Sequence, residues 1–284
     1  MRTTMIHLAL AAALVPLAAE GQQWRTIESA RQLTSTEQTR VSLTFAGGKF
    51  ELRPLTGALL YQMRLHYDEQ SSDAVHEFDA AQHQLTLGMS KANVGWRALH
   101  SMNRDDSGNM TVGLNPTVPL KLELNLGGAA ADVELGGMRV KSLKLNMGLA
   151  GGNVRFSTPN AIVMDELSVD VGLGGVNFEN LGNANVSQIN LNGGMDGVAL
   201  NFGESLMRDV KINAHVAFGG LKIQVPRSVG VKVQAETKLA NFKLQGFTRT
   251  NDAWLTPNWN ESARHVTVVV NAAFGSLEVN HSEP

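Results

Sequence analysis

The sequence predicts an all-β protein: a two-sheet β-solenoid of about six coils of 21–24 residues, with an N-terminal β domain stacked on its first coil. Three observations predict this fold. An apolar pattern recurs from Leu122 to Val279, apolar and polar residues alternate within each copy, and glycine is abundant, with 28 residues. Alternation is typical of strands, and glycine pairs between the strands indicate tight turns.

The copies of the pattern follow one another at nearly constant spacing. Successive starts are 21, 24, 22, 21, 21 and 35 residues apart, and lie at Leu122, Leu143, Leu167, Ile189, Val210, Val231 and Val266. Repeats of this length are typical of solenoids. Stacked coils place equivalent strands in parallel register, ~4.8 Å apart, so their inward faces form a ladder of Leu, Ile, Val and Phe. One coil buries too little to fold alone, and the stack folds through contacts between neighbours.

We expect three parts along the chain: a signal peptide at 1–21, an N-terminal β domain at 22–118 and the solenoid at 119–284. Pro116 and Pro119 mark the boundary, because the repeat starts directly after them. A stack has two open ends, which promote aggregation unless they are covered. The N-terminal domain is expected to cover one end. The long last spacing contains an insert at 246–265, which is expected to cap the other.

The N-terminal domain reads mostly as strands. Residues 41–52 alternate around Gly47-Gly48, and we interpret them as a hairpin that ends at Pro54. A further strand is expected at 59–67, and a second hairpin joins 75–78 to 85–89. A helix at 74–82 is the alternative for part of that hairpin. Residues 91–109 contain a loop signal, Asp-Asp-Ser-Gly-Asn, and the pattern of residues 22–39 decides neither strand nor coil.

The first residues predict export. Arg2 supplies a positive charge, and the apolar stretch from Ile6 to Leu17 has the length of a signal sequence rather than of a membrane span. Retention of this segment as an N-terminal anchor is the alternative. The chain has no cysteine, which excludes lipoprotein attachment and disulfides. No later segment is apolar enough to span a bilayer, so we expect a periplasmic or extracellular protein of the cell envelope.

The composition argues against several functions. Charged residues make up 18% of the chain, with 24 Lys and Arg against 26 Asp and Glu, so there is no basic face for nucleic acid. We find no phosphate-binding loop, no nucleophile elbow and no histidine spacing of a metal site, and we predict no catalytic residue, metal or cofactor. A polysaccharide-active enzyme is the alternative, but the outward acids do not stack with a His or Arg partner; these acids are Glu123, Glu134, Asp170 and Glu179. A small-molecule sensor is a third reading.

Two groups of residues are the candidate sites. The first lies three residues after each of the first five coil starts and predicts an external ladder of amides and acids, formed by Asn125, Asn146, Asp170, Asn192 and Asn213. A row of calcium ligands is the alternative for it. The second is the loop with Trp254, Pro257 and Trp259, either an interaction platform for carbohydrate or a cover for the apolar edge of the last coil.

The junction and the end of the chain resemble a known family. The segment NPTVPL at 115–120 resembles the junction of toast-rack proteins, and AWLTPNW at 253–259 with NAAFGSLEV at 271–279 resembles LiaF-type C-terminal and adhesin-like domains. The resemblance covers roughly residues 38–280. It implies a β-solenoid with a non-enzymatic role in the bacterial envelope, as an interaction surface or in the envelope-stress response. The partner it implies is a protein or glycan of the envelope, and it supplies no ligand residues.

Overall fold

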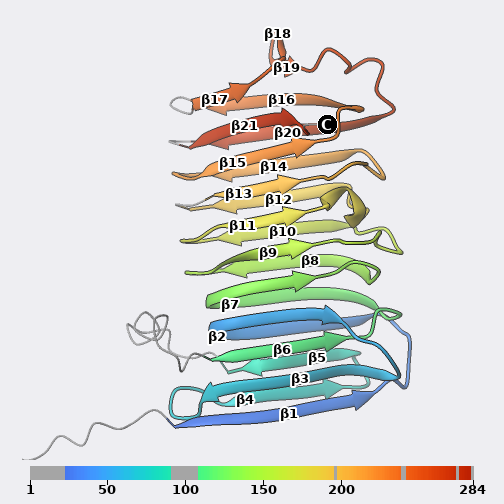
Figure 1. Cartoon of the computed structure of the whole chain (residues 1–284), viewed down its shortest axis with the longest axis vertical. Coiled ribbons are helices and arrows are strands. Elements are labelled where there is room, and N and C mark those ends of the chain that lie inside the picture. The colour runs from blue at the N-terminus through green and yellow to red at the C-terminus, as the bar shows by residue number, and fades with distance from the viewer. Residues whose placement is uncertain (1–22, 91–107, 195–196, 238–240, 273–274, 283–284) are drawn as a thin grey trace, which may run out of the picture.

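The structure is a computed structural model that describes residues 23–90, 108–194, 197–237, 241–272 and 275–282. The expected signal peptide and most of the loop at 91–109 lie outside the described residues. The described chain is almost entirely β, with one short 3-10 helix, η1 (Leu181–Ala184). Its 21 strands form one continuous sheet that does not close and that stacks into a tall two-layered solenoid (Figure 1). The predicted fold class is therefore confirmed.

Two long strands connect the layers. β2 (Thr39–Pro54) and β7 (Pro119–Glu134) each bend near the middle, so that their first halves lie in one layer and their second halves in the other. They pair in parallel along nearly their whole length, with Val41 beside Leu122 and Gly47 beside Gly128. Residues 41–52 therefore form a coil of the stack. The predicted hairpin is wrong here, because each half of β2 bonds to neighbouring coils rather than to its other half.

The remaining N-terminal strands extend both layers below β2 (Figure 1). In the first layer β4 pairs with β5, which confirms that hairpin over the helix, and β5 pairs with β2. In the second layer β1 pairs with β3, β3 with β6 and β6 with β2. The strands are β1 (Trp24–Gln32), β3 (Leu59–Asp68), β4 (Ala74–Asp79), β5 (Gln84–Met89) and β6 (Asn109–Leu114).

Above β7, each coil contributes one strand to each layer, in parallel register as predicted. The coils are β8 (Arg139–Met147) with β9 (Gly151–Arg155), β10 (Glu166–Val171) with β11 (Val176–Glu179), β12 (Gln188–Gly193) with β13 (Val198–Asn201), and β14 (Val210–Val216) with β15 (Gly220–Val225). Inward residues alternate with outward ones, so Leu145, Val169 and Leu191 are at most 2% exposed. These side chains from the two layers meet in a single core.

The last two coils do not stack in chain order. The chain first builds the outer coil, β16 (Val229–Thr237) with β17 (Asn241–Leu244), then crosses the end of the stack and returns to build β20 (Arg264–Ala272) with β21 (Ser276–His281). β20 lies between β14 and β16, and β21 lies between β15 and β17 (Figure 1). The coil that comes last in sequence is therefore the last but one in the stack.

The predicted insert covers the end of the first layer. It contains the hairpin of β18 (Thr248–Thr250) and β19 (Ala253–Leu255), and β19 pairs antiparallel with the outer edge of β16. The pairing continues at Thr256, whose N–H donates to the Val231 carbonyl and whose hydroxyl accepts from the Val231 N–H at 2.9 Å. An antiparallel strand thus occupies hydrogen-bonding groups that another coil would otherwise use.

A polar network ties the N-terminal strands to the first coils. Asn115, which is buried at the junction, donates to the Leu59 carbonyl at 2.7 Å and accepts from the Thr117 hydroxyl at 2.7 Å. On the second layer Asp132 of β7 bonds Arg53 of β2 and Arg155 of β9. The hydrogen bond from Arg53, helped by Arg155, lowers the pKa of Asp132 below its usual value.

Candidate functional site: a groove along one corner of the stack

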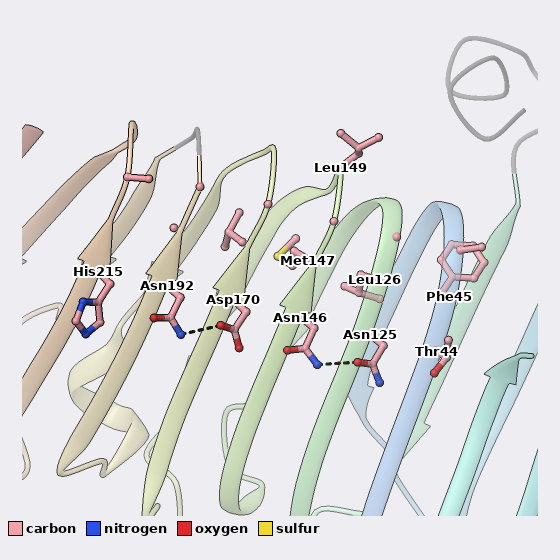
Figure 2. A pocket seen from close by; sticks show the side chains of 18 of the residues that line it. Thr44, Phe45, Asn125, Leu126, Asn146, Met147, Leu149, Asp170, Asn192 and His215 are labelled. Atoms are coloured by element: carbon pink, nitrogen blue, oxygen red, sulfur yellow. Dashed lines mark hydrogen bonds between the residues drawn. The ribbon is translucent and has the colours of Figure 1, made fainter. Parts of the chain in front are cut away.

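A groove of about 1110 Å³ runs along the corner where the first layer turns toward the second (Figure 2). It crosses the strands at right angles, so each coil contributes equivalent residues. We call it the ladder groove. Its polar row consists of Thr44, Asn125, Asn146, Asp170, Asn192, His215 and Asn271, which are register partners of one another. Its floor, two residues further along each strand, consists of Ala46, Gly127, Gly148, Gly172, Gly194 and Ala217.

The glycine floor is a consequence of the corner. A Cβ on Gly127 would lie 2.5 Å from the carbonyl oxygen of Ala46, and one on Gly194 would lie 2.6 Å from that of Gly172. These outward positions therefore accept no side chain without a shift of the backbone. Because this strip carries nothing larger than the methyl groups of Ala46 and Ala217, the outer surface is hollowed between the polar row and the side chain of Leu149, which is 36% exposed.

The polar row is partly joined along the stack. The Asn146 amide donates to the Asn125 carboxamide oxygen at 2.7 Å, and the Asn192 amide donates to the Asp170 carboxylate at 2.7 Å (Figure 2). Such amide ladders form when equivalent polar residues repeat at the strand spacing of ~4.8 Å. The structure thus brings together four of the five residues that the sequence places in a ladder.

The fifth residue, Asn213, lies in the neighbouring row. It pairs with Asn190 and donates to the Asn190 carboxamide oxygen at 2.8 Å, whereas Asn192 faces His215. The repeat pattern counts each coil from its first apolar residue. β14 has one more inward residue at its start than β12 has, so Ile212, and not Val210, lies beside Ile189. Asp170 lies four residues before the turn glycine Gly174. Counting back four residues from Gly219 and Gly275 leads to His215 and Asn271, two row members that the repeat pattern missed.

The tryptophan loop lies at the capped end of the stack. Trp254 is half-buried opposite Val233, stacks on Phe242 with ring centroids 5.8 Å apart, and carries the Arg249 guanidinium over its face. Trp259 contacts a different residue, His265, edge to face at 4.5 Å. Pro257 between them is exposed. Each indole thus packs against the protein's own last coils.

The outward acids are divided between the two layers. Glu123 and Asp170 lie on the first layer, where Glu123 pairs with Lys144 at 3.6 Å. Glu134 and Glu179 lie on the second, where Glu134 pairs with Arg155 at 3.7 Å. Paired carboxylates that act on a glycosidic bond must converge on one site, and these four do not.

Metal ligands and membrane-spanning helices are both absent from the described residues. Over the part of the chain that the structure describes, no three His, Asp or Glu side chains gather where they could hold a metal ion. Over the same residues, no helix has the length and apolar character needed to cross a bilayer.

Comparison with known proteins identifies the family. The sequence model for the N-terminal domain of toast_rack (DUF2154) matches residues 19–179, more than half of the chain. The chain therefore belongs to the toast-rack family, as its junction sequence indicated. The match extends through β11, well past the boundary at 118 that the prolines suggested. Among curated proteins none matches the chain.

Several solved structures are similar in fold. A proposed cell adhesion protein from Clostridium sporogenes is 16% identical, with a TM-score of 0.45 over 92% of this chain and 100% of that one. A proposed adhesin from Bacteroides fragilis is 10% identical, with a TM-score of 0.42 over 90% and 97%. A proposed lipid binding protein from Parabacteroides distasonis is 13% identical, with a TM-score of 0.35 over 92% and 97%.

Proposed function

We propose that this toast-rack protein is a non-enzymatic, adhesin-like scaffold that is exported and binds another component of the cell envelope through its ladder groove. The observation that carries the proposal is the groove itself: a continuous, partly apolar trough of about 1110 Å³ built from equivalent residues of successive coils. Concave surfaces of this kind are typical binding sites of repeat proteins.

Three further observations support a binding role rather than catalysis. Among the described residues that line the groove there is a single carboxylate, Asp170, and an amide of Asn192 already bonds to it. The other outward acids are paired or lie on the far layer. The chain belongs to the toast-rack family, and the resemblance to that family implies an interaction surface. For such a scaffold, residues 22–118 serve as the base of the stack and supply one end of the groove through Thr44 and Ala46, and residues 119–284 supply the rest of the binding surface.

Sedimentation with isolated envelopes of the native host tests the proposal. We expect the purified protein to sediment with them, and Asn192→Trp to reduce this to the level of the protein alone, because an indole at this exposed position fills the groove. Asn190→Trp is the matched control, since Asn190 lies on the same strand, two residues away and outside the groove. Circular dichroism verifies that both variants fold. If the wild type stays in the supernatant, or both variants bind equally, the proposal fails.

A further inference from the structure

The chemistry of the ladder groove restricts what it binds, provided that the proposed function is correct. The groove repeats the same amphipathic unit on the coils from β2 to β14: a polar side chain on one side and a glycine or alanine beside it. The polar row extends over seven coils from β2 to β20, a length of roughly 29 Å at the spacing of parallel strands. A matching ligand is therefore long and repeats an amphipathic unit of its own.

The polar row has hydrogen-bonding capacity left for a ligand. A carboxamide offers two N–H donors and an oxygen with two lone pairs. The bond between Asn146 and Asn125 uses one donor of the first and one lone pair of the second, and the bond between Asn192 and Asp170 likewise uses one of each. Both donors and acceptors therefore remain along the row. Hydroxyl groups, which both donate and accept, suit such a row best.

The floor offers apolar contact, but three of its backbone N–H groups are already used in hydrogen bonds between neighbouring coils. The N–H groups of Gly148, Gly172 and Gly194 donate to the carbonyls of the coil beneath at 2.8–2.9 Å. What these glycines present outward is their CH₂ surface. An extended peptide therefore cannot add itself to this floor as a further strand. The C–H face of a sugar ring, in contrast, needs only a flat apolar surface of this kind.

Charge excludes another class of ligand. Of the described side chains that line the groove, two are ionisable, Asp170 and His215, and they lie on coils two apart. No Lys or Arg is among the described lining residues. A polyanionic chain would find no row of cations to pair with. The groove is matched to a ligand without net charge.

The spacing of the coils distinguishes between the remaining polymers. Same-face side chains of an extended peptide recur every ~6.6 Å, which does not match coils ~4.8 Å apart. An acyl chain would fill the floor but leave the amides of the polar row unused. Each pyranose ring of an extended, β-1,4-linked polysaccharide advances the chain by close to the coil spacing, with a hydroxyl edge and a C–H face. We infer that the ladder groove binds a neutral, linear polysaccharide, one ring beside each coil.

Titration calorimetry with defined ligands tests this inference. The probes are chito-oligosaccharides and β-linked gluco-oligosaccharides of increasing length, with alginate oligomers as the polyanion and palmitate as the acyl chain. We expect affinity for at least one neutral series to rise with chain length and to level off once the oligosaccharide is as long as the polar row. Asn146→Ala combined with Asn192→Ala should weaken binding about tenfold, the equivalent of one or two net hydrogen bonds. Asn190→Ala should leave it unchanged.

The outcomes separate this inference from the proposed function. If wild-type protein sediments with envelopes but binds neither neutral series, the polysaccharide inference is wrong and the scaffold role stands. Binding of alginate or palmitate alone also overturns the polysaccharide inference. So does a loss of affinity in Asn190→Ala as large as that in the variant that combines Asn146→Ala and Asn192→Ala. If the protein binds neither envelopes nor oligosaccharides, both proposals fail.

Discussion

Leu191→Asp is expected to unfold the solenoid. Leu191 lies on β12 in the middle of the stack, is 2% exposed, and is surrounded by the inward side chains of the neighbouring coils, with Val169 below and Ala214 above. A carboxylate there would be buried without a partner. We expect a loss of roughly 4 kcal/mol or more of unfolding free energy, because a buried unpaired charge is among the most damaging substitutions. Chemical denaturation followed by circular dichroism measures it.

The control is one residue away. Asn192→Ser changes an exposed side chain of the polar row and removes one hydrogen bond to Asp170. Its cost should stay at about 1 kcal/mol, the net contribution of a typical hydrogen bond. Equal, mild effects of the two substitutions would show that the inward and outward faces of β12 are assigned incorrectly.

Gly174→Ala is expected to have the second-largest effect. Gly174 lies in the turn between β10 and β11 with φ +143°, and a Cβ there would be 1.8 Å from the carbonyl oxygen of Ala150 on the coil beneath. The backbone of one coil or the other must move. A strained backbone conformation of this kind costs roughly 1–3 kcal/mol, to which the collision adds. Thermal unfolding should show a clear decrease in Tm.

Gly193→Ala is the matched comparison. Gly193 lies near the same corner on the next coil, but nothing lies within 4 Å of the position that a Cβ would occupy, and its φ is not in the left-handed region. Its Tm should therefore change little. If Gly174→Ala is as mild as Gly193→Ala, the close approach of neighbouring coils at this corner does not exist in solution.

The sequence predicted the fold well because its signals are local and repeated. Alternation of buried and exposed residues and the glycine pairs specify strands that bend at a fixed point, and only stacking buries the inward face of each coil. The alternation of residues 41–52 around a glycine pair is the same pattern, and it belongs to a coil of the stack. It was misread as a hairpin, because a period of two does not tell which strand pairs with which.

The order of the last coils could not be predicted from the pattern. β16 and β20 both present alternating valines, starting at Val231 and Val266, and either would fit beside β14. What distinguishes them is the edge that faces the cap: β19 bonds the outer side of β16, so β20 must lie inside. This is a tertiary contact between short strands, and it leaves no periodic signal in the sequence.

The candidate site was partly predictable for a related reason. The amides at Asn125, Asn146 and Asn192 repeat, and their alignment was visible in the sequence. The groove was not, because it results from the absence of side chains at the glycine floor and from the exact register at the corner. One additional inward residue at the start of β14 moved Asn213 out of the row and His215 into it.

The most direct test of the account is the position of β20, because the ladder groove reaches Asn271 only if β20 lies beside β14. The chain has no cysteine, so introduced pairs are the sole thiols. Asn213 is the register partner of Val269, which in turn is the partner of Gln234. Under mild oxidation, Asn213→Cys with Val269→Cys should form a disulfide, detected by non-reducing electrophoresis and mass spectrometry. Asn213→Cys with Gln234→Cys should not, because two strand spacings, ~9.6 Å, exceed the reach of a disulfide. Efficient cross-linking of Asn213→Cys to Gln234→Cys, with none to Val269→Cys, would mean that the coils stack in chain order and would contradict the account.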